Sequence, residues 1–312
     1  MTNPTMQKFS QSLKLMGNNF TITVVAQNNV VGKQNIEMAI TEIRRIEELF
    51  TTFKPNSQTN LINDNAGIKP VQVCPEVFDL IERSIAISKI TQGAFDITYG
   101  SIDKTLWNFD QKMKKLPDAE TARKMVHLIN YKNIVLDKEK SSVFLKQKGM
   151  RIGFGGIGKG YAAEMAKSVL IKNGITSGII NASGDLSAWG SQPNGKQWTI
   201  GIANPDFPQA AFSYLEISNK AVATSGNYEK YIKIDGKKYS HTIDPKTGLP
   251  ITGIKSVTVI SENAEFADAM ATPIAVMGIS AGLFLIDQIP DLHCIIIDDD
   301  NNIYTSKKIN LK

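Results

Sequence analysis

The chain has 312 residues, of which 42% are hydrophobic and 21% charged, as in soluble globular proteins. Its formal net charge is +5, and the basic residues are spread along the chain, so we expect no nucleic-acid partner. No apolar run is long enough for a membrane-spanning segment, and no secretion signal is visible, so the sequence as it stands predicts a soluble cytoplasmic protein. A periplasmic or membrane-anchored protein would require that an N-terminal signal has been removed.

The first half of the chain predicts a mixture of helices and strands. Residues 1–14 are polar and are expected to be frayed, whereas residues 15–312 are expected to form a single domain. Alternation and helical spacing of apolar residues place the elements that follow. In chain order they are, within 15–26, a turn at 16–17 followed by a strand, then a helix (35–53), a polar surface loop (53–67), a helix (75–93), a helix (118–129) with Asp118 as N-cap, and two strands (133–136 and 143–145).

The second half begins with a glycine cluster followed by apolar residues at helical spacing, which predicts a turn that opens a helix. The remaining predicted elements are strands at 177–181, 197–203, 212–217 and 221–228, a hairpin at 231–242, a strand at 256–261, helices at 263–277 and 279–288, and paired strands at 294–297 and 303–305. Residues 241–250 are polar and irregular. This order of elements predicts an α+β fold.

The glycine cluster is the first candidate binding site. Gly153, Gly155, Gly156, Gly158 and Gly160 surround Lys159, and the run is not a P-loop. Glycines allow a ligand close to the backbone, and a helix N-terminus with a lysine attracts an anion, so the cluster suggests a phosphate-bearing ligand. The alternative is a tight strand-to-helix turn that binds nothing.

Two further groups of residues could carry chemistry. His241 is accompanied in the sequence by other polar residues that could take part in catalysis, namely Thr224, Ser225 and Asp244. Its imidazole could take a proton from a hydroxyl at neutral pH, although a lone histidine is often structural. Asp268 and Thr272 are four residues apart on one predicted helix, so their oxygens share a face and could bind Mg²⁺ together with phosphate oxygens and water. A helix surface without a ligand would show the same spacing.

Eight separated motifs resemble one family, the FAD:protein FMN transferases of the ApbE family. They occur in the family's order and cover nearly the whole chain from residue 15. The motifs are M-G-N-N-F (16–20), F-K-P-N-S (53–57), G-A-F-D (93–96), G-G-I-G-K-G-Y-A (155–162), N-A-S-G-D (181–185), A-T-S-G-N-Y-E (223–229), H-T-I-D-P-K-T-G (241–248) and A-D-A-M-A-T (267–272).

The resemblance implies a tunnelling-fold-like α+β core with two intimately joined subdomains and FAD in a cleft between them. It implies a transferase that depends on Mg²⁺ and uses FAD as substrate. AMP leaves, and FMN is esterified to a Thr or Ser hydroxyl of an acceptor flavoprotein. Two other functions remain open: an FAD pyrophosphatase that gives free FMN and AMP, and a flavin-binding protein without turnover.

The resemblance also assigns roles to individual residues. His241 looks like the residue that activates the acceptor hydroxyl, and Asp268, Thr272 and the Gly156 carbonyl look like Mg²⁺ ligands. The residues that match FAD-contacting positions are Met16, Phe53, Ala94, Phe95, Asp96, Lys159, Glu164 and Asp185. The chain departs from the family at Phe53, where Tyr is usual, and at Gly153, where Asp is frequent.

Overall fold

The computed structural model describes residues 5–105, 115–203, 211–226, 231–234, 236–307 and 309. Its main feature is an eight-stranded sheet in the order β1-β2-β6-β7-β10-β13-β14-β15, and every pairing in it is antiparallel. The strands are β1 (Gln7–Leu15), β2 (Asn18–Ala26), β6 (Gly178–Ala182), β7 (Asp185–Trp189), β10 (Lys220–Gly226), β13 (Ile254–Ser261), β14 (His293–Asp298) and β15 (Ile303–Thr305). Together with the helices, this sheet gives the α+β class that the sequence predicts.

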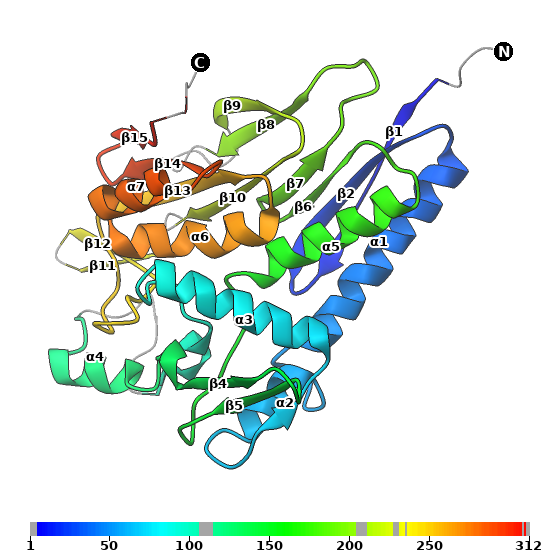
Figure 1. The fold of residues 1–312 in the computed structure, drawn as a ribbon. Helices are drawn as coiled ribbons and strands as arrows, with labels where there is room; N and C mark the ends of the chain where they lie inside the picture. Colours follow the sequence, from blue (N-terminus) through cyan, green and yellow to red (C-terminus); the bar gives the residue numbers. More distant parts are fainter. Residues whose placement is uncertain are drawn as a thin grey trace.

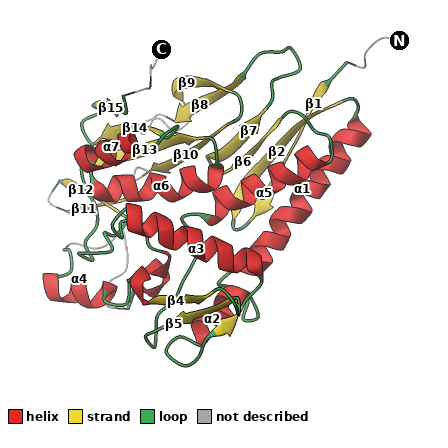
Figure 2. Ribbon diagram, in the orientation of Figure 1, coloured by secondary structure: helices red, strands yellow, loops and turns green. Residues whose placement is uncertain are grey.

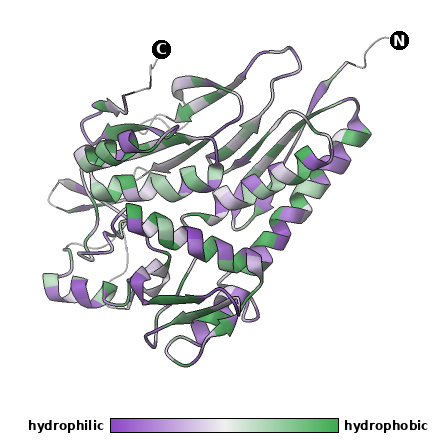
Figure 3. Ribbon diagram, viewed as in Figure 1, coloured by the Kyte–Doolittle hydropathy of each residue, from purple (hydrophilic) through white to green (hydrophobic). Residues whose placement is uncertain are grey.

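Helices cover one face of this sheet (Figure 1). They are α1 (Asn29–Phe50), α5 (Gly158–Lys172), α6 (Ala264–Met277) and α7 (Ile279–Gln288). Along α1, Ile36, Ile40 and Ile43 are buried at helical spacing, and Figure 3 shows hydrophobic and hydrophilic residues alternating along this helix. The apolar side of α1 is therefore its buried side.

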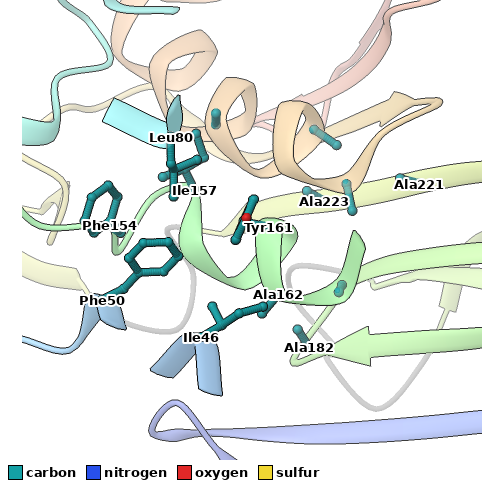
Figure 4. Packing of buried hydrophobic residues seen from close by; sticks show 14 of the residues in the cluster. Ile46, Phe50, Leu80, Phe154, Ile157, Tyr161, Ala162, Ala182, Ala221 and Ala223 are labelled. Atoms are coloured by element: carbon teal, nitrogen blue, oxygen red, sulfur yellow. The ribbon is translucent and has the colours of Figure 1, made fainter. Parts of the chain in front are cut away.

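Buried hydrophobic side chains from several parts of the chain pack around the start of α5 (Figure 4). Phe50 from α1 packs against Phe154 and Tyr161, with ring centroids 4.6 and 5.5 Å apart. Ala162 and Ala166, on the side of α5 that is packed in the core, are fully buried and small. Small side chains let a helix lie close to its neighbours, so the start of α5 is held in a precise position.

A smaller region packs below the main sheet (Figure 2). It contains a three-stranded sheet in the order β3-β5-β4 and is continuous with the main core through buried residues such as Leu80 and Leu145. Its elements are α2 (Gln58–Asp64), β3 (Val71–Gln72), α3 (Pro75–Ile90), the 3₁₀ helix η1 (Ile97–Ser101), α4 (Ala119–Val126), η2 (Tyr131–Asn133), β4 (Ile134–Asp137) and β5 (Ser142–Leu145).

Two hairpins complete the fold. The first, β8 (Trp198–Ala203) with β9 (Ala211–Ile217), contributes Trp198, Ile202 and Ile217 to a second buried cluster that also contains Leu186 and Val222 of the main sheet. The other hairpin, β11 (Tyr231–Ile234) with β12 (Lys237–Ser240), packs with α4 in a third hydrophobic cluster. The buried side chains of this cluster are Met125, Val126, Ile232 and Ile243.

The structure corrects some predicted elements. Residues 7–14 are not frayed but belong to β1, which pairs with β2 along its whole length; residues 1–4 lie outside the described part. The surface loop at 53–67 contains α2, whose start is capped by Ser57. Residues 185–189 form β7, which the sequence analysis did not predict. Within the described residues, no helix is both long enough and apolar enough to span a membrane.

Candidate active site

The glycine-rich turn leads directly into α5, and α6 crosses close to its start. A Cβ atom on Gly160 would lie 2.1 Å from the carbonyl oxygen of Ala264, so only glycine allows the two backbones to touch here. At Gly153 and Gly155, by contrast, an added Cβ would meet nothing within 4 Å. Packing therefore explains Gly160 but leaves open space at the other two positions, as expected where a ligand approaches the backbone.

Lys159 lies between two buried aspartates. Its Nζ atom is 2.6 Å from Asp185 Oδ2 and 3.4 Å from Asp268 Oδ1. Asp268 Oδ2 also accepts a hydrogen bond of 2.9 Å from the Gly160 N–H, and Asp185 Oδ1 accepts one of 3.2 Å from the Thr224 N–H. The first turn of α5, the first residue of β7 and the second turn of α6 thus meet at one point. We call Lys159, Asp185 and Asp268 the lysine–aspartate centre.

The lysine–aspartate centre carries one more negative than positive charge when all three groups are ionised. Burial and the neighbouring Asp268 raise the pKa of Asp185 to about 6, although Lys159 opposes this shift. Burial lowers the pKa of Lys159, but the two carboxylates outweigh burial and hold that pKa above its usual value. Lys159 therefore stays protonated, and the uncompensated carboxylate charge favours a bound cation.

The residues beside this centre are suited to a hard cation such as Mg²⁺. Asp268 Oδ1 has only the 3.4 Å contact with Lys159, and Thr272 Oγ1 donates to Ser225 Oγ at 3.2 Å, which leaves its lone pairs available. In the described part of the chain, no three His, Cys, Asp or Glu side chains form a potential metal cluster. A metal here would therefore take one carboxylate and complete its shell with hydroxyl, carbonyl, phosphate and water oxygens, as Mg²⁺ commonly does.

His241 lies at the surface, at the start of the irregular segment between β12 and β13. Two hydrogen bonds hold this segment in place. The Ile243 N–H donates to the Tyr99 hydroxyl at 3.1 Å, and the Gly248 N–H donates to the Asp244 carbonyl at 2.9 Å. Gly248, with φ of +73°, lies directly against the Ala122 carbonyl of α4, where a Cβ would be 2.0 Å away. The exposed imidazole is thus carried by an ordered segment.

The family model described as the ApbE family matches residues 16–296. The chain belongs to the ApbE family. A relative from Klebsiella pneumoniae named FAD:protein FMN transferase is 31% identical over 306 residues, which cover 97% of this chain and 93% of the relative. One from Vibrio cholerae with the same name is 26% identical over 298 residues, which cover 93% of this chain and 88% of the relative.

A solved ApbE structure also matches the fold. The crystal structure of the ApbE protein from Thermotoga maritima superposes with a TM-score of 0.86 at 30% identity, and the match covers 96% of this chain and 97% of that chain. The α+β fold implied by the resemblance is therefore confirmed over nearly the whole chain.

Several residues at ApbE motif positions surround the glycine-rich turn. A Cβ on Gly158 would lie 3.7 Å from Met16 Cε, and a Cβ on Gly156 would lie 3.6 Å from Phe95 Cε2. Met16 is half-buried in the β1–β2 turn, while Ala94 and Phe95 are buried. Phe53, in contrast, is 94% exposed. The structure therefore brings Met16 and Phe95 to the turn, and leaves the ring of Phe53 available to a flat ligand.

Asp96 has a structural role in the ApbE fold of this chain. It caps η1: its Oδ1 accepts from the N–H and hydroxyl of Thr98, and its Oδ2 accepts from the Tyr131 N–H at 2.7 Å. Burial raises the pKa of Asp96, and these hydrogen bonds oppose the shift. The carboxylate thus ties the 93–96 motif to η2, in agreement with the simple capping role that the residue type suggests.

Glu164 is buried between three elements of the ApbE core. Its Oε1 accepts a 2.9 Å bond from the Ala264 N–H at the start of α6 and a 2.7 Å bond from Ser187 Oγ of β7. Lys167 Nζ lies 3.3 Å from its other oxygen. Since Ala264 also touches Gly160, Glu164 fixes the α5–α6 crossing that sets Asp268 beside Lys159.

Sequence reasoning missed three supporting residues: Tyr99, Ser187 and Lys167. Ser187 could have been found from the alternation along 185–189, had that strand been recognised, because it shares a sheet face with Asp185. For Tyr99, whose hydroxyl holds Ile243, the sequence offers no signal. Asn227, Tyr228 and Glu229 of the 223–229 motif lie outside the described residues.

Proposed function

We propose that this chain transfers FMN from FAD to a Thr or Ser hydroxyl of an acceptor flavoprotein and releases AMP. The observation that carries the proposal is the buried lysine–aspartate centre, which has excess negative charge and lies beside a glycine-rich turn with open space. Relatives that align along nearly the whole chain carry the name FAD:protein FMN transferase, which supports the same reaction.

In this proposal Asp268, Thr272 and the Gly156 carbonyl would hold Mg²⁺. Bound there, Mg²⁺ supplies charge neutralisation for the pyrophosphate of FAD and for the departing AMP. Asp268 is suited to this role because the Gly160 N–H and Lys159 orient its carboxylate before any metal arrives. Thr272 is oriented by Ser225.

Lys159 positions the phosphates of FAD in the proposed reaction. Asp185, 2.6 Å away, holds the ammonium in place and keeps it charged. The open backbone at Gly153 and Gly155 allows a phosphate or the flavin close to the turn. With Mg²⁺ bound beside Asp268, the centre would carry a net positive charge, and preorganised positive charge stabilises the transition state of phosphoryl transfer because it needs no rearrangement when charge develops.

His241 takes the proton of the acceptor hydroxyl. The hydroxyl oxygen forms a bond to the phosphorus of the FMN half, and the bond from that phosphorus to the bridging oxygen breaks, so that AMP leaves with the bridging oxygen. His241 is exposed. A surface imidazole suits an acceptor that is itself a folded protein, because only a small part of such an acceptor can enter the site.

Mass spectrometry of an FMN-binding acceptor protein after incubation with this chain, FAD and Mg²⁺ tests the proposal. We expect a mass gain equal to phosphoester-linked FMN, with AMP released in equal amount. Free FMN and AMP with no modified acceptor, for every acceptor tried, would replace the transferase with an FAD pyrophosphatase. Intact FAD bound one to one, with turnover absent at all Mg²⁺ concentrations, would identify a flavin-binding protein instead.

A further inference from the structure

A basic hollow of about 600 Å³ lies between the end of α3, α4, η2 and the segment that carries His241. Four cationic side chains from four separate parts of the chain surround it. They are Lys89, Arg123, Lys132 and Lys246. The other residues of its wall are mainly neutral, such as Gln92, Asn130 and Tyr131. We call this feature the basic hollow.

The cations of the basic hollow have no carboxylate partner in the part of the chain that the structure describes. Other basic residues do: Arg45 pairs with Glu76, Arg83 with Glu265, and Lys124 of α4 with Glu120. Four unpaired like charges around one concave surface repel each other and create a positive potential. This repulsion destabilises the folded protein unless an anion binds there.

Among the described residues that line the basic hollow, Asp96 is the only carboxylate, and it does not neutralise the cations. Its two oxygens are buried and accept hydrogen bonds from Thr98 and Tyr131. The four cationic residues, in contrast, are exposed. Their positive charge therefore points to solvent, where a binding partner can reach it.

The basic hollow borders the segment that carries His241 and is separate from the lysine–aspartate centre. Pro245 and Lys246, which line it, follow His241 in the same ordered segment, and Gly248 fixes this segment against α4. A partner held in the hollow would therefore contact the segment that carries His241. None of Lys159, Asp185 and Asp268 lines it.

We propose that the basic hollow docks an acidic segment of the acceptor protein, an inference that rests on the proposed function. A single phosphate would need convergent, buried donors, whereas these cations are exposed and come from three helices and one irregular segment. Such an arrangement fits several carboxylates on one peptide. Complementary charges at the edge of a reaction site speed encounter and set the register of the partner, which would direct the acceptor hydroxyl towards His241.

Fluorescence anisotropy with two labelled decapeptides tests the docking directly. One peptide is rich in Glu and contains a single Thr, and its counterpart has Gln in place of every Glu. We expect the acidic peptide to bind at least about tenfold more tightly than the neutral one at low salt, with the difference shrinking as salt rises. Equal affinities for the two peptides would overturn the proposal.

The double variant Lys89→Glu/Arg123→Glu locates the binding site. We expect it to weaken the acidic peptide about tenfold or more and to leave FAD binding, followed by flavin fluorescence, unchanged. Lys69→Glu/Lys148→Glu is the matched control: both residues are exposed lysines outside the hollow, and the change in net charge is identical. An equal loss in the control would show that only net charge matters, and a loss of FAD affinity would place the hollow in the FAD site; either result overturns the proposal.

Kinetics with a modifiable acceptor separate this inference from the proposed function. We expect the double variant to raise KM for the acceptor about tenfold with kcat and KM for FAD unchanged. If the wild-type chain transfers no FMN to any acceptor but still binds the acidic peptide through the hollow, the proposed function fails while the docking site stands. An unchanged acceptor KM in the double variant would overturn the docking role.

Discussion

The lysine–aspartate centre and the His241 segment are built in opposite ways. The centre is buried, and the backbone contact between Gly160 and Ala264 determines its geometry together with Glu164. The His241 segment is irregular, His241 itself is exposed, and the segment is anchored by the small cluster around Met125, Ile232 and Ile243. In the first region the fold itself places the charges, whereas in the second a few local bonds place one side chain.

This contrast corresponds to two parts of the proposed reaction. The pyrophosphate of FAD needs fixed charges in a region with little water, where electrostatic interactions are strong. The acceptor is a protein and needs a site that it can reach from solvent. We therefore expect changes in the lysine–aspartate centre to affect stability and catalysis together, and changes at the exposed His241 side chain to affect mainly catalysis.

The largest effect is expected for Asp268→Asn. The substitution removes the proposed carboxylate ligand of Mg²⁺, and since a catalytic metal is worth several kcal/mol, AMP release from FAD should fall about 10³-fold or more. Thermal unfolding should begin at lower temperature, because Gly160 and Lys159 lose a charged partner. Glu262→Gln, on an exposed carboxylate that pairs with Lys220, is the control. Wild-type turnover at equal Mg²⁺ would refute the metal site.

His241→Ala should abolish most transfer without changing stability. Loss of a general base typically costs about 10²–10⁴-fold in rate. The imidazole is exposed, so the midpoint of thermal unfolding should stay within a degree or so of the wild-type value. Mass spectrometry of the acceptor gives the rate, and circular dichroism the unfolding midpoint. If the variant transferred FMN at the wild-type rate, another group would have to accept the proton.

Glu164→Gln should have an intermediate effect. Gln keeps the size of the side chain but loses the charge that strengthens the bonds to Ala264, Ser187 and Lys167. Hydrogen bonds to a charged group are worth about 1.5–3 kcal/mol, so we expect the free energy of unfolding to fall by a similar amount and kcat to fall roughly tenfold. FAD affinity should change little. A large loss of FAD affinity with unchanged unfolding would instead make Glu164 a ligand contact.

Phe53 should give the smallest effect. Its ring is 94% exposed, so Phe53→Ala should leave the free energy of unfolding unchanged. If the ring stacks on FAD, its removal costs about 0.5–1.5 kcal/mol, which is roughly a two- to twelvefold rise in KM for FAD. Phe53→Tyr keeps the ring and serves as the conservative variant. Equal KM values for all three chains would show that Phe53 does not contact FAD.

Many elements could be predicted from the sequence because their patterns are local. The helices α3, α6 and α7 have regular apolar spacing and clear end signals, such as Pro75 and the N-cap Asn263. Strand β1 was missed because it lies at the edge of the sheet, where Phe9 and Leu13 are only partly buried and the residues between them are polar. Its partner strand, not its composition, determines its conformation.

The site was predictable as a set of residues but not as an arrangement. Motif positions identified Lys159, Asp185 and Asp268 separately, yet their contact depends on how α5, β7 and α6 pack. Glu164 and Asp96 show the limit more clearly. Asp96 stands in the 93–96 motif and Glu164 just after the 155–162 motif, and in the fold their oxygens accept hydrogen bonds from backbone N–H groups of η2 and α6. No sequence pattern distinguishes such a carboxylate from one that faces a ligand.

The backbone contact between Gly160 and Ala264 also limits how the length of this chain can change. One residue inserted between Ala264 and Asp268 would turn the Asp268 side chain by about 100° around the axis of α6 and move it away from Lys159. The contact itself would remain, so the fold could survive while the site is lost. Insertions in the β14–β15 turn, which is largely exposed, would disturb neither helix. Tolerance to insertion should therefore differ sharply between these two places.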